Sequence, residues 1–118
     1  MRSNKEIIRF EEGRYVGDVQ GDIRHGWGKF TLWGGGVYEG SFHLNKMQGR
    51  GTFTYKNGDV YVGNWNDDER SGFGKIDYED GSSYEGSWTN DERSGAGTYY
   101  FENGDRYVGN WSEDEAQS

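Results

Sequence analysis

The chain repeats itself every 23 residues, and this period limits its fold more than any other feature of the sequence. A glycine follows each recurring tyrosine after two positions, and a glycine pair and a closing glycine recur with the same period. These recurring positions hold 17 of the 21 glycines, so the repeat is not a chance pattern. A unit this short cannot bury a core alone, so the copies must stack on one another. The recurring tyrosines are Tyr15, Tyr38, Tyr61, Tyr84 and Tyr107.

Each unit has the pattern of a β-hairpin. Tyr61, Gly63 and Trp65 alternate with other residues, as side chains on one face of a strand do. Asp80-Gly81 is a tight-turn signal, as are the Asn-Gly pairs at 57–58 and 103–104. Proline and a helical period are both absent. We therefore predict an all-β fold, a single-layer antiparallel meander of stacked β-hairpins with about nine or ten strands. The polar segments 20–26, 43–49, 66–72 and 89–95 are expected to be the hairpin loops.

The period also divides the chain into units. We expect an N-terminal lead at 1–7, a partial repeat at 8–14, four repeats at 15–37, 38–60, 61–83 and 84–106, a partial repeat at 107–111 and an acidic tail at 112–118. The tail is expected to be disordered because it has nothing to bury. A meander has two open edges, and no capping element is apparent. The edge at 107–111 is therefore expected to be continued by more repeats or to pair with another chain across a two-fold axis.

Composition restricts the possible partners. The net charge is -8 and the pI about 4.7, which opposes binding to nucleic acid and to anionic lipid. The chain has no cysteine, which excludes disulfides and thiolate metal sites and agrees with a cytoplasmic location. The first ten residues do not have the pattern of a signal peptide. Aliphatic residues are few, but 9 Tyr and 5 Trp supply apolar surface, roughly 150–250 Å² for each ring.

The repeat resembles the membrane occupation and recognition nexus (MORN) repeat. The segments Tyr84-Glu-Gly-Ser-Trp88 and Lys56-Asn-Gly-Asp59 match the family pattern nearly residue by residue, and the resemblance covers about 8–111. It implies an elongated, twisted solenoid of hairpins. It also implies a scaffold of the kind found in ciliary and cytoskeletal assemblies, in junction proteins, or attached to lipid kinases and methyltransferases. The first repeat departs from the pattern at Val19, where Trp is usual.

Two rows of rings are the best candidates for a binding site. Stacked hairpins place successive members of a row roughly 10 Å apart. The rings could simply pack on one another and on Ile76, Tyr78, Tyr99 and Phe101. A single-layer sheet cannot cover all of its own rings, so some could also form a groove for a peptide or helix. The candidate partner-binding residues are Tyr38, Phe42, Tyr61, Trp65, Tyr84, Trp88, Tyr107 and Trp111.

Charged residues recur in the polar segments as well. Arg24, Arg70 and Arg93 share one phase of the repeat and are expected to form a solvated charge ladder, a rim for a partner, or a weak cation site beside nearby aspartates. His25 and His43 stand at different phases, and no Ser or Cys is marked out as a nucleophile. We therefore expect no catalytic residues, no metal site and no cofactor.

These observations favour a non-enzymatic scaffold. It would bind a protein segment, or another copy of itself, along the aromatic groove, in a cytoplasmic setting such as a cytoskeletal or ciliary assembly. Two alternatives stay open at this point. An aromatic ladder could recognise a glycan or small ligand, although such repeats usually have a shorter period. Attachment to a lipid surface is suggested by the family name but opposed by the charge.

Overall fold

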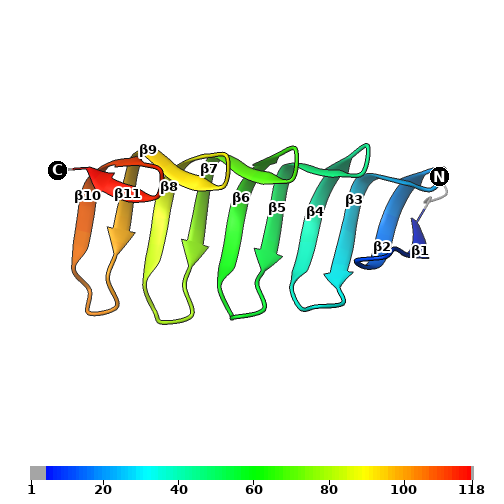
Figure 1. Cartoon of the computed structure of the whole chain (residues 1–118), viewed down its shortest axis with the longest axis horizontal. Helices are drawn as coiled ribbons and strands as arrows, with labels where there is room; N and C mark the ends of the chain where they lie inside the picture. Colours follow the sequence, from blue (N-terminus) through cyan, green and yellow to red (C-terminus); the bar gives the residue numbers. More distant parts are fainter. Residues whose placement is uncertain (1–4, 118) are drawn as a thin grey trace.

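The computed structural model describes residues 5–117 as one open antiparallel sheet in which each strand pairs with the next along the chain (Figure 1). This confirms the all-β, single-layer meander, with eleven strands in the described residues rather than nine or ten. The strands are β1 (Lys5–Arg9), β2 (Gly13–Gln20), β3 (Ile23–Leu32), β4 (Val37–His43), β5 (Lys46–Thr54), β6 (Val60–Asn66), β7 (Glu69–Asp77), β8 (Ser83–Thr89), β9 (Glu92–Tyr100), β10 (Arg106–Ser112) and β11 (Glu115–Gln117).

The expectation of long hairpin loops at 20–26, 43–49, 66–72 and 89–95 is wrong. In each of these segments the strands continue to a turn of only two residues. In the third repeat only Asp67 and Asp68 form the turn, and both have positive φ, at 53° and 70°. A two-residue turn of this kind matches the twist of the paired strands. The polar residues that follow the turn are extended and paired with β6. Their polarity shows that they lie near solvent, and it does not prevent pairing.

The acidic tail is also ordered where the structure describes it, so the expected disorder is wrong for Glu115–Gln117. These residues form β11, which pairs with β10 and is the last strand of the sheet. Two contacts hold the segment in place. Asp114 accepts hydrogen bonds from Arg93, and the Tyr107 hydroxyl donates to the backbone oxygen of Gln117 at 2.6 Å. The tail is therefore held by hydrogen bonds and needs no buried apolar side chain.

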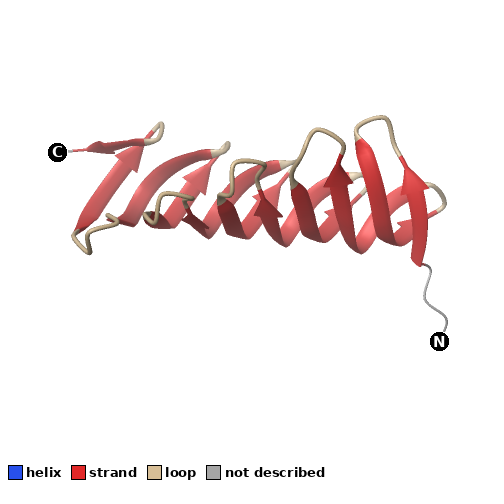
Figure 2. Ribbon diagram, turned by 90° about the horizontal axis from the view of Figure 1, so that it is seen from below, coloured by secondary structure: helices blue, strands red, loops and turns tan. Residues whose placement is uncertain are grey.

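One irregularity recurs in every repeat. The register between the two strands of a hairpin shifts just after the first glycine, for example between Gly63 and Trp65. Such β-bulges bend a strand and increase its twist. The strands are accordingly curved (Figure 2), and the whole molecule is elongated, with extents of 50 × 27 × 23 Å.

The core is a line of rings on one face of this curved sheet. Four tyrosines have no exposed surface, and each hydroxyl donates to the backbone oxygen three residues further along, as Tyr61 does to Asn64 at 2.9 Å. The tryptophan Nε1–H groups bond to glycine carbonyls of the preceding repeat, as Trp88 does to Gly74 at 3.1 Å. A Cβ on Gly74 would collide with the Tyr61 ring, so the recurring glycines make room for the tyrosines. The four fully buried tyrosines are Tyr15, Tyr38, Tyr61 and Tyr84.

Candidate functional site

The eight rings that the sequence suggested as a partner-binding ladder lie together on the core face. Along the molecule each ring contacts the next edge to face, with centroids 5.1–5.7 Å apart. Seven of the eight are buried, with at most 8% of their surface exposed, and only Tyr107 is partly open. The seven are therefore core residues here, and a role for them in binding stays a prediction. The eight are Tyr38, Phe42, Tyr61, Trp65, Tyr84, Trp88, Tyr107 and Trp111.

A second row of aromatic side chains borders the buried ladder and reaches solvent. Tyr55 and Tyr78 are half-buried, and Phe101 is 48% exposed. All three lie just after a strand, at the same phase of the repeat. Tyr99 lies beside this row, with its ring centroid 6.1 Å from that of Tyr78 and 4.9 Å from that of Phe101. The 23-residue period is sufficient to identify this row. From the sequence, Tyr78, Tyr99 and Phe101 were expected only as packing partners of the ladder.

Two hollows open beside these rings, with volumes of about 290 and 420 Å³. Arg93 lines both, so they are neighbours on the same side of the sheet. Their position next to partly exposed aromatic side chains makes this strip a part of the ring-bearing face that a partner can reach. We call it the groove. It is defined by Tyr55, Arg70, Tyr78, Arg93, Tyr99 and Phe101.

The sequence suggested that the arginines beside the groove form a solvated charge ladder. In the structure they instead make hydrogen bonds and cover rings. The backbone N–H and Nε of Arg70 both donate to Oδ1 of Asp91, at 2.8 and 3.1 Å, and Nη2 donates to the Asp91 backbone oxygen at 2.7 Å. The guanidinium carbon also lies 4.6 Å from the ring centroid of Trp88. Arg93 repeats this arrangement with Asp114 and Trp111. Each arginine therefore joins one hairpin tip to the next while covering a core ring.

Four consecutive segments of the chain match the family model of the MORN repeat, at 15–32, 38–60, 61–83 and 84–106. The chain belongs to the MORN repeat family. The matched segments coincide with the stacked hairpins, and together they cover most of the chain. The comparison with curated proteins found no match to this sequence. MORN repeats make the chain a repeat-protein interaction module, and proteins of this family are generally non-catalytic scaffolds.

One MORN repeat lacks the arginine of its neighbours. Met47 stands at the position of Arg24, Arg70 and Arg93, and its backbone N–H still donates to Oδ1 of Asp68 at 2.8 Å. Lys46 approaches the same carboxylate at 3.7 Å. A hollow of about 210 Å³ lies here, walled mainly by apolar side chains. The ring-bearing face thus changes along the molecule, from apolar walls near Met47 to tyrosines and guanidinium groups in the groove.

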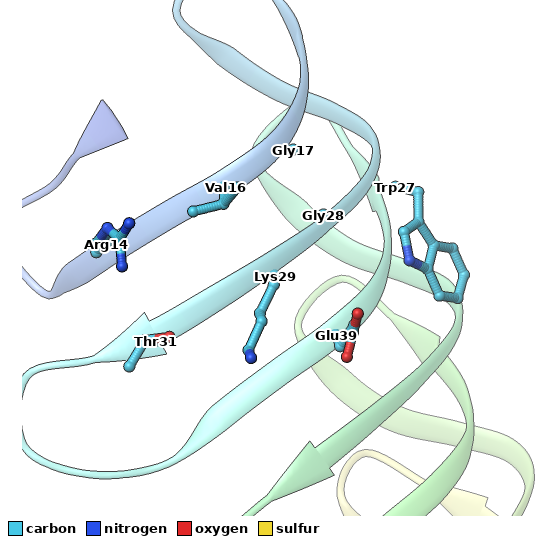
Figure 3. Close-up of a pocket in the computed structure, with 8 residues that line it drawn as sticks. All are labelled: Arg14, Val16, Gly17, Trp27, Gly28, Lys29, Thr31 and Glu39. Atoms are coloured by element: carbon cyan, nitrogen blue, oxygen red, sulfur yellow. The ribbon is translucent and has the colours of Figure 1, made fainter. Parts of the chain in front are cut away.

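The MORN repeats present a different surface on the other face of the sheet. Side chains that alternate with the buried tyrosines point away from the core, and several are large and apolar. Trp27 is 52% and Phe73 53% exposed. Figure 3 shows Val16, Lys29 and Glu39 on three neighbouring strands of this face, with the Trp27 ring standing beside them. We call this the outer face.

Burial shifts the pKa of the tyrosines on the ring-bearing face. Burial raises the pKa of Tyr84 to about 12, while the charge of Arg93 acts in the opposite direction. The phenols therefore stay neutral near pH 7. The ring centroids of His25 and His43 lie 4.8 Å apart with the rings tilted, near the N-terminal repeats rather than at the groove. Within residues 5–117 no group of three or more His, Cys, Asp or Glu side chains could hold a metal ion, and no helix is long and apolar enough to cross a membrane.

Proposed function

We propose that this MORN-repeat chain is a non-enzymatic interaction module that holds a segment of a partner protein along the groove. The observation that carries the proposal is the partly exposed row of Tyr55, Tyr78 and Phe101, with guanidinium groups beside it and hollows between. Aromatic and arginine side chains are the residue types that most often anchor protein interfaces. The proposed setting is a cytoplasmic assembly, cytoskeletal or ciliary, in keeping with the repeats.

The spacing of the groove favours a helical segment. Successive repeats are two strands apart, so equivalent side chains recur at about 10 Å. Residues seven apart on an α-helix recur at about 10.5 Å along its axis and point in the same direction. One face of an amphipathic helix can therefore place an apolar side chain beside each repeat. An extended peptide advances by about 6.6 Å for every two residues, which does not match the repeat.

The test removes aromatic rings that line the groove and leaves the buried rings of the core in place. Tyr55→Ser with Tyr78→Ser removes two half-buried rings, whereas Tyr100→Ser removes a half-buried tyrosine from the outer face of β9 and is the matched control. Each protein serves as bait in extracts of the native source, and mass spectrometry identifies what it retains. Segments of the recovered partners are then titrated by calorimetry.

We expect the wild type and Tyr100→Ser to retain the same partner, and the groove variant to bind its segment at least about tenfold more weakly. Circular dichroism and thermal melts establish that all three proteins are folded. Equal affinity for a folded groove variant would exclude the groove as the binding surface.

A further inference from the structure

The outer face carries a ladder that repeats every 46 residues, twice the period of the hairpins. Strand register places one residue of each strand in a single row across the sheet, from β2 to β10. The first four members are Val16, Lys29, Glu39 and Thr52. Residues 62, 75, 85 and 98 repeat the same four residue types in the same order, and Val108 begins the series again.

If a second copy is placed against the first with its row running in the opposite direction, each lysine of one row faces a glutamate of the other. A two-fold axis parallel to the strands and between β5 and β6 would bring β4 against the partner's β7 and β3 against the partner's β8. Glu39 would then face the partner's Lys75, and Lys29 would face the partner's Glu85. Symmetry doubles each contact, which gives four opposite-charge pairs. An axis moved by half a strand, onto β6, would instead place Glu39 against the partner's Glu85, so the charges select the register.

The neighbouring row on the outer face obeys the same symmetry. Trp27 and Phe73 are its aromatic members, 46 residues apart, and Ser41 and Ser87 stand beside them on the next strands, while Arg50 and Asn64 occupy the row on β5 and β6. The same axis places Phe73 over the partner's Ser41, and Trp27 over the partner's Ser87. Hollows of about 340 and 450 Å³ lie beside these positions, the first of them shown in Figure 3. Large rings would therefore meet small residues and open space.

Charge is also divided between the two halves of the chain. Residues 1–56 contain nine Lys or Arg and six Asp or Glu, a net charge of +3, whereas residues 57–118 contain four and fifteen, a net charge of -11. The two halves follow one another along the 50 Å axis, so the net charge is positive towards the N-terminal end and negative towards the C-terminal end. A reversed second copy brings the basic half of one chain against the acidic half of the other.

We propose that the outer face binds the outer face of a second copy of this chain, with the long axes running in opposite directions. Packed sheets cross at about 30°, so the contacts of β4 to β7, nearest the axis, contribute most. A face of a 50 × 27 Å molecule is large enough for the roughly 800 Å² per partner of a specific interface. The exposed rings of Trp27 and Phe73 become covered, and the groove on the opposite face stays free for another partner.

Charge reversal tests this pairing with the whole chain. Lys29→Glu combined with Lys75→Glu gives an outer face with four glutamates, and Glu39→Lys combined with Glu85→Lys gives one with four lysines. Lys56→Glu changes an exposed charge in the turn after β5 and is the control. Analytical ultracentrifugation over a roughly hundredfold range of concentration measures the association of each protein and of an equimolar mixture.

We expect the wild type and Lys56→Glu to form dimers that weaken in about 1 M salt. Each charge-reversed protein alone should be monomeric over this concentration range, with a dissociation constant at least about tenfold higher than that of the wild type. The equimolar mixture should form a heterodimer. Lys29, Glu39 and Lys75 are exposed and Glu85 is half-buried, so thermal melts establish folding of each variant. Phe73→Ser provides a second variant without a charge change, and it should also dissociate the dimer.

A wild type that stays monomeric at all concentrations would overturn the proposal. So would a dimer that both charge-reversed proteins retain, since that result would place the contact at the open edges β1 or β11. A mixture that fails to pair while both components are folded would show that the charges do not select this register.

Discussion

At the scale of single residues, each buried tyrosine depends on two glycines of its own hairpin. The ring of Tyr61 lies over Gly63 and Gly74, which face each other across β6 and β7. A Cβ on Gly63 would approach the tyrosine hydroxyl oxygen to 2.7 Å, closer than side-chain atoms pack. This mutual requirement explains why tyrosine and glycine recur together through the chain. The ring supplies buried area, and the glycines supply the space for it.

The hydroxyl of each such tyrosine also satisfies a carbonyl at the bulge. Removing it in Tyr61→Phe leaves the ring in place but takes away the 2.9 Å hydrogen bond to Asn64. We expect a loss of about 1 kcal/mol in the free energy of unfolding, because a partly buried carbonyl loses the hydroxyl that donates to it. Urea denaturation measures the change, and Tyr100→Phe on the outer face is the control. Equal effects of the two substitutions would contradict this role of the hydroxyl.

The same phenols predict a loss of stability at high pH. Burial raises the pKa of Tyr15 and of Tyr84 from 10.0 to about 12. It also raises the pKa of Tyr38 and Tyr61. The unfolded chain then releases protons at a lower pH than the folded chain does, so the stabilisation is complete below pH 10 and falls as the pH rises towards 12. Urea midpoints recorded from about pH 8 to about pH 12 test this, and a flat profile above pH 10 would contradict it.

At the scale of the elements, the arginines add a further connection between hairpins that already share strand pairing, ring contacts and the tryptophan hydrogen bonds. Each arginine of this series reaches a turn residue 21 positions later and covers a ring of the following repeat. Side chains of Arg70 and Arg93 are only 20% exposed. Because these contacts are partly shielded from water, they are stronger than ordinary surface ion pairs. The hairpin tips thus form a continuous line of contacts along one edge of the molecule.

Restoring the absent arginine should strengthen this line. Met47→Arg places a guanidinium next to Asp68, whose carboxylate already accepts the backbone N–H of residue 47, as Asp91 does for Arg70. We expect an increase of about 0.5–1.5 kcal/mol in the free energy of unfolding. Met47→Leu keeps the apolar volume and should give no gain. A lower stability for Met47→Arg than for Met47→Leu would show that Lys46 already occupies this carboxylate.

The sequence predicted the hairpins well because the features that form them are periodic. Alternation around Tyr61 and the Asn-Gly pairs were sufficient to assign strands and their order. The loop expected at 66–72 contains the turn at Asp67-Asp68 but was too long, because polar residues near a turn resemble a loop even when they are paired. β11 and the arginine contacts were missed for another reason. Asp114 stabilises them through a residue 21 positions earlier, and only the register of the folded sheet brings the two together.

Only part of the candidate site was predicted from the sequence, namely the part that follows from the period. The period located a line of rings correctly on one face, but composition alone cannot tell which rings are covered. Trp88 is buried because Arg70 lies over it, whereas Tyr78 stays partly open. The distinction depends on how the bulges bend each hairpin over its neighbour, which is a property of the assembled sheet.

At the scale of the whole molecule, each repeat contacts only its neighbours, so the ends must differ from the middle. A central hairpin such as β6–β7 is paired on both sides, and Tyr61 is fully buried. At the C-terminal end, β10 is paired with a strand of only three residues, and Tyr107 is partly exposed. Stability should therefore fall towards this end.

Hydrogen exchange measures this gradient directly. We expect the slowest amide exchange in β5 to β8 and the fastest in β10 and β11, because opening an end breaks contacts on one side only. Asp114→Ala removes the acceptor of Arg93 and should speed exchange in β9 and β10 by about tenfold, while β2 to β5 keep their rates. The matched change Asp77→Ala removes an exposed carboxylate from a central strand and should leave the C-terminal rates unchanged. Equal protection in all strands, with equal acceleration everywhere in Asp114→Ala, would show that the sheet unfolds as one cooperative unit. The contacts between hairpin tips would then couple all of the repeats, and the single short strand β11 would stabilise a molecule 50 Å long.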